Sequence, residues 1–461
     1  MEYKTLRVEA DSLGQIIVPE SAYWGPQTAR AVTNFPLSGV SVGSFHSLIK
    51  SLAQVKLACA RVNARTLLLE PRIADAIQSA CADIIAGTLN SQFPIDVFQG
   101  GAGTSTNMNM NEVVANRALE HLGLMRGRYD VVHPNDHVNM AQSTNDVYPT
   151  AIRVALISES SALAEALLHL ATAFEVKGEE FAGISKLGRT QLQDAVPMTL
   201  GQEFQGFATT LREDVIRLAE IAKLLHEVNL GGTAIGTGLN AGPVYSVEIV
   251  PELARVTGLP LVRADNLVEA CWDTGAFVLF SAMLKRTAIK LSKISSDLRL
   301  LSSGPRGGLG EINLPALQPG SSIMPGKVNP VMPEVINQIA FFVAGADVTV
   351  TMAAEAGQLQ LNVMEPVIAY SLLNVIGLLA RGIEALRTSC VEGITANPAA
   401  CEGHLQRSTA LVTALVPHLG YDTAAEIAKR MLAEGITLSE VLPSPPTSVQ
   451  AVLSAFSNSD A

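Results

Sequence analysis

The chain has 461 residues, of which 48% are hydrophobic and 16% are charged, and its net charge is −11 at pH 7. This negative charge argues against nucleic acid as a partner, because nucleic-acid-binding proteins carry basic surfaces that neutralise phosphates. Only 5% of the residues are aromatic, so the core must consist mainly of Ala, Leu, Ile and Val, which favours closely packed helices.

The N-terminal part has the pattern of short helices and loops and is predicted to form a first domain, 1–145. Its opening residues contain no apolar core of a signal peptide, so we expect a cytoplasmic protein. The five cysteines of the chain are scattered without a CxxC pair, a pattern that is typical of reduced, buried thiols.

Long stretches with helical periodicity follow. They are 150–181, 198–229, 266–303, 333–356 and 366–392. In the first of them, Leu163, Leu167 and Leu170 recur at steps of four and three residues, which places them on one helix face. Five long helices in succession predict an elongated bundle in a central domain, 146–395.

No segment of the sequence is expected to span a membrane. The best apolar run, Pro366–Ala380, falls short of the ~20 apolar residues that a spanning helix needs. A soluble chain that is apolar and carries few charges usually buries part of its surface in an oligomer, so we expect a multimer.

Two segments rich in Gly and Pro, 231–243 and 304–330, separate the predicted helices. The second is long for a loop without periodicity, and loops of this length in compact domains are usually functional or disordered. After the last long helix, the chain is predicted to end in a small helical domain, 396–461.

Familiar cofactor motifs do not fit this sequence. The glycines of 236–242 lack the spacing of a dinucleotide-binding loop, and Val328 stands where a phosphate loop needs Ser or Thr to bind magnesium. The eight histidines form no HExxH motif, so no metal site is predicted. No Ala-Ser-Gly triplet is present to form a self-made electrophile, and we expect that no cofactor is required.

Four segments combine hydroxyl and amide side chains with few charges. They are 100–109, 133–146, 188–194 and 320–330. Three of them immediately precede a predicted long helix, where backbone N–H groups and the helix dipole favour anions. Each has a simpler explanation, because Ser143–Asp146 fits a helix cap, Thr104–Asn109 a polar turn, and Lys327 a solvated surface lysine. The last segment alone is unusual by itself, since its glycines, prolines and paired serines predict a shaped loop.

The last segment, Gly320-Ser-Ser-Ile-Met-Pro-Gly-Lys-Val-Asn-Pro330, resembles the signature of the aspartase/fumarase superfamily, and the other three match that superfamily in order and spacing. The resemblance covers the chain from about Asp11 to about Val441. It implies a mostly α, three-domain subunit with a long central five-helix bundle. It also implies a homotetramer with a twenty-helix core, in which residues from three subunits compose each active site.

Within the superfamily the chain is more similar to aspartate ammonia-lyases than to fumarases. Gln191 stands where fumarases carry His, and the segments 331–335 and 355–366 also resemble the ammonia-lyases. The resemblance therefore implies elimination of ammonia from L-aspartate to give fumarate. Fumarate hydratase, a lyase acting on an N-substituted aspartate, and a non-catalytic protein on the same scaffold stay open as alternatives. The C-terminal unit ends soon after Leu442 and is expected to depart from the family pattern, which leaves activation by a divalent cation open.

The resemblance also implies roles for individual residues. Those expected around the β-carboxylate are Thr104, Ser143, Thr144 and Ser322. Those expected to hold the α-carboxylate are Lys327 and Asn329, with Thr190. Those expected to orient the amino group are Asn145, with Gln191 or Thr104. Ser321 is the implied general base, with Lys327 nearby, and the segment 304–330 is expected to act as a lid.

Overall fold

The structure is a computed structural model that describes residues 5–456. The chain forms two compact units. Unit 1 comprises 1–163, 217–285 and 342–377, and unit 2 comprises 164–216, 286–341 and 378–461. Residues 1–4, on which the expectation of no signal peptide partly rests, lie outside the described residues. The division into three domains, 1–145, 146–395 and 396–461, stays a prediction.

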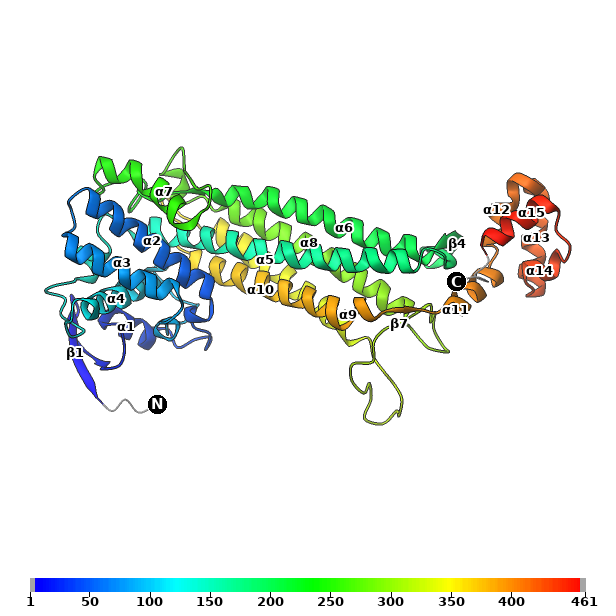
Figure 1. Ribbon diagram of the computed structural model, residues 1–461, viewed down its shortest axis with the longest axis horizontal. Coiled ribbons are helices and arrows are strands. Elements are labelled where there is room, and N and C mark those ends of the chain that lie inside the picture. Colours follow the sequence, from blue (N-terminus) through cyan, green and yellow to red (C-terminus); the bar gives the residue numbers. More distant parts are fainter. Residues whose placement is uncertain (1–4, 457–461) are drawn as a thin grey trace. The chain divides into compact units, whose positions relative to one another are not determined.

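Several α-helices and β-strands lie wholly within unit 1. They are β1 (Leu6–Asp11), β2 (Gly14–Pro19), α1 (Pro26–Asn34), α2 (His46–Arg65), α3 (Pro71–Ile85), α4 (Thr104–His121), β5 (Glu227–Val228), α7 (Pro243–Thr257) and β6 (Val262–Arg263). Strands β1 and β2 form an antiparallel hairpin, and β5 pairs with β6 in parallel. Helix α2 packs against α3 and α7, and α3 packs against α4 (Figure 1).

Unit 2 also contains elements of its own. They are β3 (Ser185–Thr190), β4 (Gln193–Thr199), β7 (Ile312–Asn313), β8 (Thr395–Ala396), α11 (Pro398–Arg407), α12 (Ala410–Leu419), α13 (Tyr421–Glu434), α14 (Leu438–Val441) and α15 (Thr447–Ala455). Strands β3 and β4 form an antiparallel hairpin, and β7 pairs antiparallel with β8. Helices α12, α13 and α15 pack around a small apolar core that includes Leu411, Leu415 and Met431.

Five long helices contribute residues to both units. They are α5 (Thr144–Glu180), α6 (Leu200–Ala222), α8 (Gly275–Leu301), α9 (Val331–Glu355) and α10 (Glu365–Ser389). The prediction of a mostly helical chain is confirmed. Two of the predicted helices were too long, because α6 ends at Ala222 and α8 begins only at Gly275. Before α8, the Asn266 side chain accepts hydrogen bonds from the backbone of Val268 and Glu269, which produces a turn instead of a helix.

Within unit 2 the long helices are held together by apolar and polar contacts. Aromatic rings of α5 and α6 pack edge to face, with the ring centroids of Phe174 and Phe207 5.5 Å apart. The Lys290 ammonium of α8 lies 2.7 Å from the buried Asp214 carboxylate of α6. The Asn337 amide of α9 donates to the Ser292 hydroxyl of α8 at 2.8 Å. These contacts fix the helices from which the β3–β4 hairpin and the loop before α9 extend.

Three helical segments, α5, α9 and 365–393, are long and apolar enough to cross a membrane by length and composition. The expectation that no segment reaches this size is therefore wrong by that criterion. The expectation was based on uninterrupted runs of apolar residues. A long helix can contain isolated polar residues and still have a high mean hydropathy. In the structure, 61% of the apolar window in 365–393 is buried against the protein itself.

Candidate active site

The second polar segment forms a turn at the start of α5, in unit 1. We call residues 143–146 the α5 turn. Ser143 is the N-cap, and its hydroxyl accepts a hydrogen bond from the backbone N–H of Asn145 at 3.2 Å. In return, the Asp146 carboxylate accepts from the backbone N–H of Ser143 at 2.9 Å. The turn is thus a reciprocal helix cap, as the simpler explanation holds, but its other contacts exceed what capping requires.

Asp146 also connects the α5 turn to the glycine-rich segment that follows β5. Its second carboxylate oxygen accepts from the backbone N–H groups of Gly231 and Thr233, each at 3.0 Å. The side chain is fully buried, and this burial raises the pKa of Asp146 to about 6. Three donated N–H groups compensate part of the cost of burying the charge.

Asn145 is held to the same glycine-rich segment. Its side-chain amide donates to the carbonyl of Ala234 at 2.8 Å, so its side-chain oxygen remains available as an acceptor. The carbonyl of Asn145 would normally bond to the N–H of residue 149, but Pro149 has none. The Asn229 side chain donates to that carbonyl instead, at 2.9 Å.

Thr144 lies at the edge of a buried network of amides. Its hydroxyl accepts a hydrogen bond from the Asn107 side chain at 3.1 Å. That amide also donates to the Asn139 side chain at 3.2 Å, and the same Asn139 oxygen accepts from the Lys56 ammonium at 3.0 Å. Burial lowers the pKa of Lys56 to about 8. Lys56, Asn107 and Asn139 were not predicted as site residues.

Thr104, from the first polar segment, is the first residue of α4 and is exposed. It follows Gly103, whose φ of +85° belongs to the left-handed region. A Cβ at Gly103 would lie 2.5 Å from the ring of Tyr148, so the close approach of this turn to α5 requires glycine. The four predicted residues of unit 1, namely Thr104, Ser143, Thr144 and Asn145, thus lie at the N-terminal ends of two helices.

In unit 2, Thr190 and Gln191 lie at the tip of the β3–β4 hairpin, where both are exposed. The expectation that they lie beside a helix N-terminus is wrong, because strand β4 separates them from α6. The two turn residues, Gln191 and Leu192, have φ of +56° and +61°. Neither residue type favours this conformation, so the turn is strained, as is common at functional sites.

The fourth segment forms a loop that closes on itself; we call residues 320–329 the serine loop. The backbone N–H of Gly320 donates to the carbonyl of Lys327 at 2.7 Å, and the Asn329 side chain donates to the carbonyl of Gly320 at 2.8 Å. A Cβ at Gly320 would lie 2.7 Å from that Lys327 carbonyl, which explains the glycine. Asn329 therefore shapes the base of the loop.

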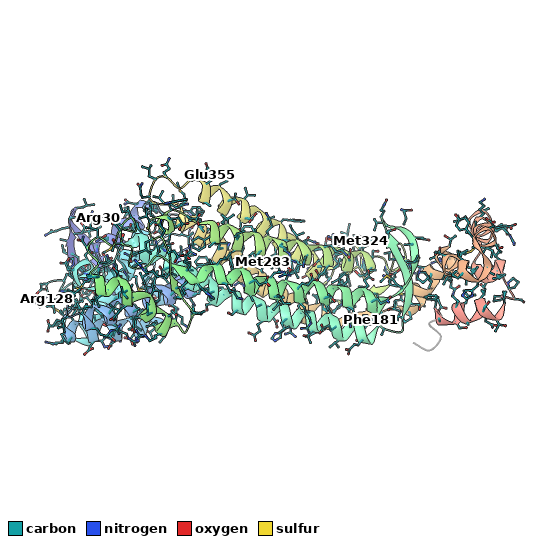
Figure 2. The ribbon with its side chains drawn as sticks, turned by 90° about the horizontal axis from the view of Figure 1, so that it is seen from above. Arg30, Arg128, Phe181, Met283, Met324 and Glu355 are labelled. Carbon is teal, nitrogen blue, oxygen red and sulfur yellow. The ribbon has the colours of Figure 1, made fainter. Side chains whose placement is uncertain are left out.

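The Ser321 hydroxyl accepts two hydrogen bonds inside the serine loop. They come from the backbone N–H groups of Ile323, at 3.2 Å, and Met324, at 3.1 Å. Ser322 and Lys327 are exposed on the same loop, and the half-exposed Met324 side chain is labelled in Figure 2. Two N–H groups directed at one hydroxyl oxygen would stabilise a negative charge on it.

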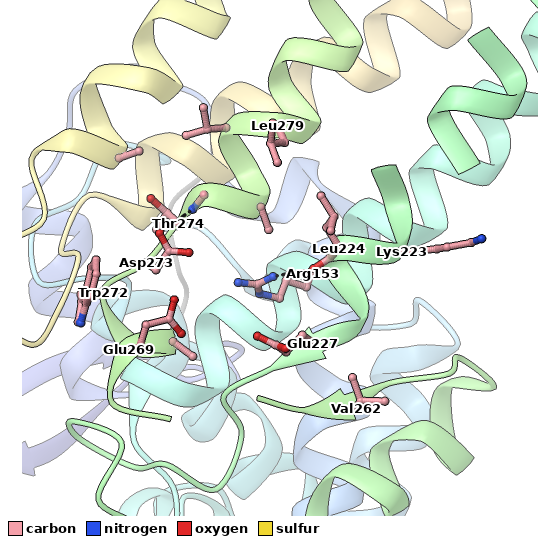
Figure 3. A pocket seen from close by; sticks show the side chains of 15 residues that line it. Arg153, Lys223, Leu224, Glu227, Val262, Glu269, Trp272, Asp273, Thr274 and Leu279 are labelled. Atoms are coloured by element: carbon pink, nitrogen blue, oxygen red, sulfur yellow. Dashed lines mark hydrogen bonds between the residues drawn. The ribbon is translucent and has the colours of Figure 1, made fainter. Parts of the chain in front are cut away.

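A cavity of about 780 Å³ in unit 1 contains none of the predicted site residues. Its central cation is the buried Arg153, which donates to the carbonyl of Leu224 at 3.3 Å, with Glu227, Glu269 and Asp273 in the cavity wall (Figure 3). Burial lowers the pKa of Arg153, although nearby carboxylates oppose the shift. We assign this cavity no part in the reaction.

The described residues, 5–456, contain no group of three or more His, Cys, Asp and Glu side chains that could hold a metal ion. The five cysteines are free and buried. Burial raises the pKa of the Cys59 thiol, and likewise that of Cys81, to about 12, which makes these thiols poor nucleophiles. The predicted site residues of the two units carry only hydroxyl groups, amides and one ammonium group.

Comparison with known proteins identifies the family of the chain. Residues 14–345 match a family model described as lyase, and 411–444 match a fumarase C C-terminus model. The expectation that the C-terminal unit departs from the family pattern is thus wrong for 411–444. That expectation rested on the unit's short length.

Individual relatives match over nearly the whole chain. An aspartate ammonia-lyase from Pseudomonas fluorescens is 58% identical, covering 95% of this chain and 92% of its own. A crystal structure of fumarate lyase:delta crystallin from Brucella melitensis, bound to cobalt, is 57% identical with a TM-score of 0.96, covering 98% and 99%. A class II fumarase from Schistosoma mansoni is 37% identical with a TM-score of 0.90, covering 95% of each chain. The chain therefore belongs to the aspartase/fumarase superfamily of lyases and is a carbon–nitrogen lyase of the aspartate ammonia-lyase group.

Proposed function

We propose that this enzyme reversibly eliminates ammonia from L-aspartate to give fumarate, through an aci-carboxylate intermediate, with Ser321 as the general base. The observation that carries the proposal is the pair of backbone N–H groups on the Ser321 hydroxyl. A free serine is far too weak an acid to act as a base. It acts here only as an alkoxide, which these N–H groups and the nearby Lys327 stabilise.

The difficult step is removal of a proton from the carbon next to a carboxylate, because the product carries a second negative charge on that carboxylate. Preorganised hydrogen-bond donors lower the energy of such a charge. The hydroxyls of Ser143 and Thr144 each accept an N–H from the protein. Their own protons are therefore free to point toward the substrate, and in the described part of the chain neither hydroxyl donates to a protein group. Thr104 and Ser322 complete the donors around the β-carboxylate.

The other end of the substrate is an α-carboxylate and an ammonium group. Lys327 supplies the positive charge that binds the α-carboxylate, with Asn329 and Thr190 as further donors. This local charge offsets the net charge of −11 of the chain. The free side-chain oxygen of Asn145 accepts a hydrogen bond from the ammonium group, with Gln191 or Thr104 as its companion. Gln191 has no titratable group, so ammonia leaves without a strong general acid.

The segment 304–330 acts as a lid, in which the serine loop closes over the bound substrate while the residues around Glu311 stay anchored. Closure brings Ser321 to the Cβ hydrogen and excludes water from the site. The support is the geometry of the loop, whose two ends are joined by the contacts among Gly320, Lys327 and Asn329. A loop closed in this way moves as one piece and keeps the base oriented.

The enzyme is a cytoplasmic homotetramer with a twenty-helix core, and three subunits contribute residues to each active site. Exposed apolar side chains on α9 support this assembly, since Phe341 is 68% exposed and Met352 is 68% exposed. The partners of the enzyme are L-aspartate, fumarate and ammonia, with no nucleic acid and no membrane. No cofactor is required, and activation by a divalent cation is left to experiment.

The substrate is tested by supplying the pure enzyme with fumarate and either ammonium, water alone or a panel of larger amines. We expect L-aspartate from ammonium and no malate from water. Malate as the main product would make the enzyme a fumarate hydratase. An N-substituted aspartate formed in preference to L-aspartate would assign it to a lyase of substituted substrates.

The base is tested with Ser321→Ala. We expect kcat to fall by about 10²- to 10⁴-fold, the range of general base catalysis, while aspartate binding and the oligomer are retained. Ser302→Ala is the matched control, because Ser302 follows the end of the preceding helix and its hydroxyl donates to the carbonyl of Arg299. Turnover near wild type in Ser321→Ala would exclude this serine as the base.

A further inference from the structure

Glu311 is a fully buried carboxylate at the root of the segment that carries the serine loop. Its oxygens form ion pairs with the Lys186 ammonium and with the Arg189 guanidinium, each at 2.8 Å. Both cations belong to strand β3 of the hairpin. One acidic side chain thus joins two segments that are far apart in the sequence.

The strength of this connection follows from the burial of the charge. The Glu311 side chain is 0% exposed, and within residues 5–456 neither of its oxygens accepts a conventional hydrogen bond. Among the described residues, the two cations are therefore the partners of its charge. Removal of one partner from a buried ion pair leaves an uncompensated charge, so such pairs are strongly retained. The positions of Lys186 and Arg189 relative to Glu311 are correspondingly fixed.

The backbone of Glu311 is held as firmly as its side chain. Its N–H donates to the carbonyl of Leu301, at the end of α8, at 2.9 Å, and its carbonyl accepts from the N–H of Asn397 at 2.9 Å. The residue cannot follow a movement of the hairpin without breaking these bonds. Glu311 is therefore a fixed point to which the hairpin is attached.

The attached part of the hairpin adjoins its strained tip. Arg189 directly precedes Thr190 and Gln191, and the turn residues Gln191 and Leu192 both have positive φ. A turn of this kind needs support from its surroundings to persist. The Arg189–Glu311 ion pair provides that support on the β3 side of the tip, directly before Thr190 and Gln191.

We propose that Glu311 is a positioning residue, which keeps the hairpin tip with Thr190 and Gln191 in a fixed place relative to the root of the serine loop. This role rests on the proposed function, in which both segments bind the substrate. Glu311 itself touches no substrate. Loss of the ion pairs frees the two segments from each other. Thr190 and Gln191, which bind the α-carboxylate and the amino group of aspartate, are then misplaced.

Four variants separate this role from simple stabilisation. Glu311→Gln removes the shared charge, and Arg189→Gln removes only the connection to the hairpin tip. Glu203→Gln is the matched control, because Glu203 pairs with the same Lys186 at 2.6 Å but belongs to helix α6. Arg189→Lys keeps a cation and tests rescue.

The first measurement is hydrogen–deuterium exchange of the tetramer in peptides covering 188–194 and 312–330. We expect faster exchange in both peptides for Glu311→Gln and Arg189→Gln, and wild-type exchange for Glu203→Gln. The second measurement is kinetics, where kcat/KM for aspartate should fall on the order of 10²-fold in the first two variants, through both KM and kcat. Arg189→Lys should recover part of both effects.

The proposal is overturned if Arg189→Gln and Glu203→Gln behave alike in both measurements, or if only the melting temperature changes. If Glu311→Gln does not fold, the proposal is tested with Arg189→Gln. That variant keeps the ion pair between Lys186 and Glu311 and loses only the connection to the hairpin tip. Exchange rates do not depend on turnover. A failure of the Ser321 base would therefore appear in Ser321→Ala and leave the exchange result readable.

Discussion

The α5 turn and the serine loop are built in opposite ways, although both present serine hydroxyls to the proposed substrate. The α5 turn is held by partners from distant parts of unit 1, among them Asn107, Gly231 and Thr233. The serine loop is held mainly by itself, through contacts between Gly320, Lys327 and Asn329. The first region is held in place by its surroundings, whereas the second is held by its own contacts, as the proposed lid requires.

This difference fits a division of labour in the reaction. Donors that stabilise a developing charge are effective only when they need no reorganisation during the reaction, so they belong on a fixed turn. A base must be shielded from water during the reaction, and the site must then open to release the product. Such a base belongs on a segment that opens and closes. The hydroxyls differ accordingly, since Thr144 and Ser143 each accept one protein N–H, whereas Ser321 accepts two.

After the loss of the Ser321 base, the largest effect is expected when a donor of the α5 turn is removed. Thr144→Val keeps the shape of the side chain but removes the hydroxyl, so kcat should fall by about 10²- to 10³-fold. The measurement is steady-state kinetics of aspartate elimination, with circular dichroism to confirm the fold. The reason is that the Thr144 oxygen accepts the Asn107 amide, which leaves its hydroxyl proton to donate to the substrate.

Thr144→Ser is the matched control, since it keeps the hydroxyl and loses only a methyl group. It should retain most of the activity. Equal losses in both variants would mean that Thr144 acts through packing at the start of α5. The Thr144 hydroxyl would then be excluded as a donor to the substrate, and the α5 turn would not be a preorganised donor site.

The next effect concerns the carboxylate that fixes the α5 turn. Asp146→Asn should lower kcat/KM by about 10²-fold, because it cannot accept all three backbone N–H groups and the turn shifts. Since burial raises the pKa of Asp146 to about 6, the wild-type carboxyl takes up a proton already below pH 6. Wild-type kcat/KM should therefore decrease as the pH falls through about 6.

The pH profile separates this role from a general loss of stability. Asp146→Asn has no proton to take up, so its lower activity should lack the acidic decrease near pH 6. A variant profile parallel to that of the wild type would assign the decrease to another group. In that case Asp146 would serve only to stabilise unit 1.

Much of the fold was predictable because long helices leave a strong periodic pattern in the sequence. The five long helices occur where the apolar periodicity places them, and the errors lie at their ends. The predicted start of α5 was Thr150, whereas the helix begins at Thr144 and passes through Pro149. The sequence could not show that Asn229, remote in the chain, would bond to the carbonyl that Pro149 leaves unpaired.

The candidate site was predictable only in its parts that form continuous motifs. The segments around Ser143 and Ser321 are polar, clustered and similar to a known family. Lys56 and Asn107 lie on the helices α2 and α4 and are buried, and no local pattern marks a single lysine as part of a site. Glu311 was missed for the same reason, because its partners Lys186 and Arg189 are adjacent only in the folded unit.

The smallest effects are expected from two glycines that share a conformation but differ in their surroundings. Gly103, before α4 and next to the α5 turn, has φ of +85°, and Gly326 of the serine loop has φ of +81°. An Ala at either position is strained by roughly 1–2 kcal/mol in this region. A Cβ at Gly103 would also lie 2.5 Å from the Tyr148 ring, whereas at Gly326 it would meet nothing within 4 Å.

Gly103→Ala should therefore cost about 1–3 kcal/mol more than Gly326→Ala, because the buried ring has to shift. Thermal unfolding measures the difference, and Gly307→Ala, in a part of the lid segment where an added Cβ meets nothing within 4 Å, is the control for an added methyl group. Equal losses of stability would show that the surroundings of the α5 turn yield as easily as those of the loop. A clear difference supports a fixed turn, since only tightly packed surroundings resist one additional carbon atom.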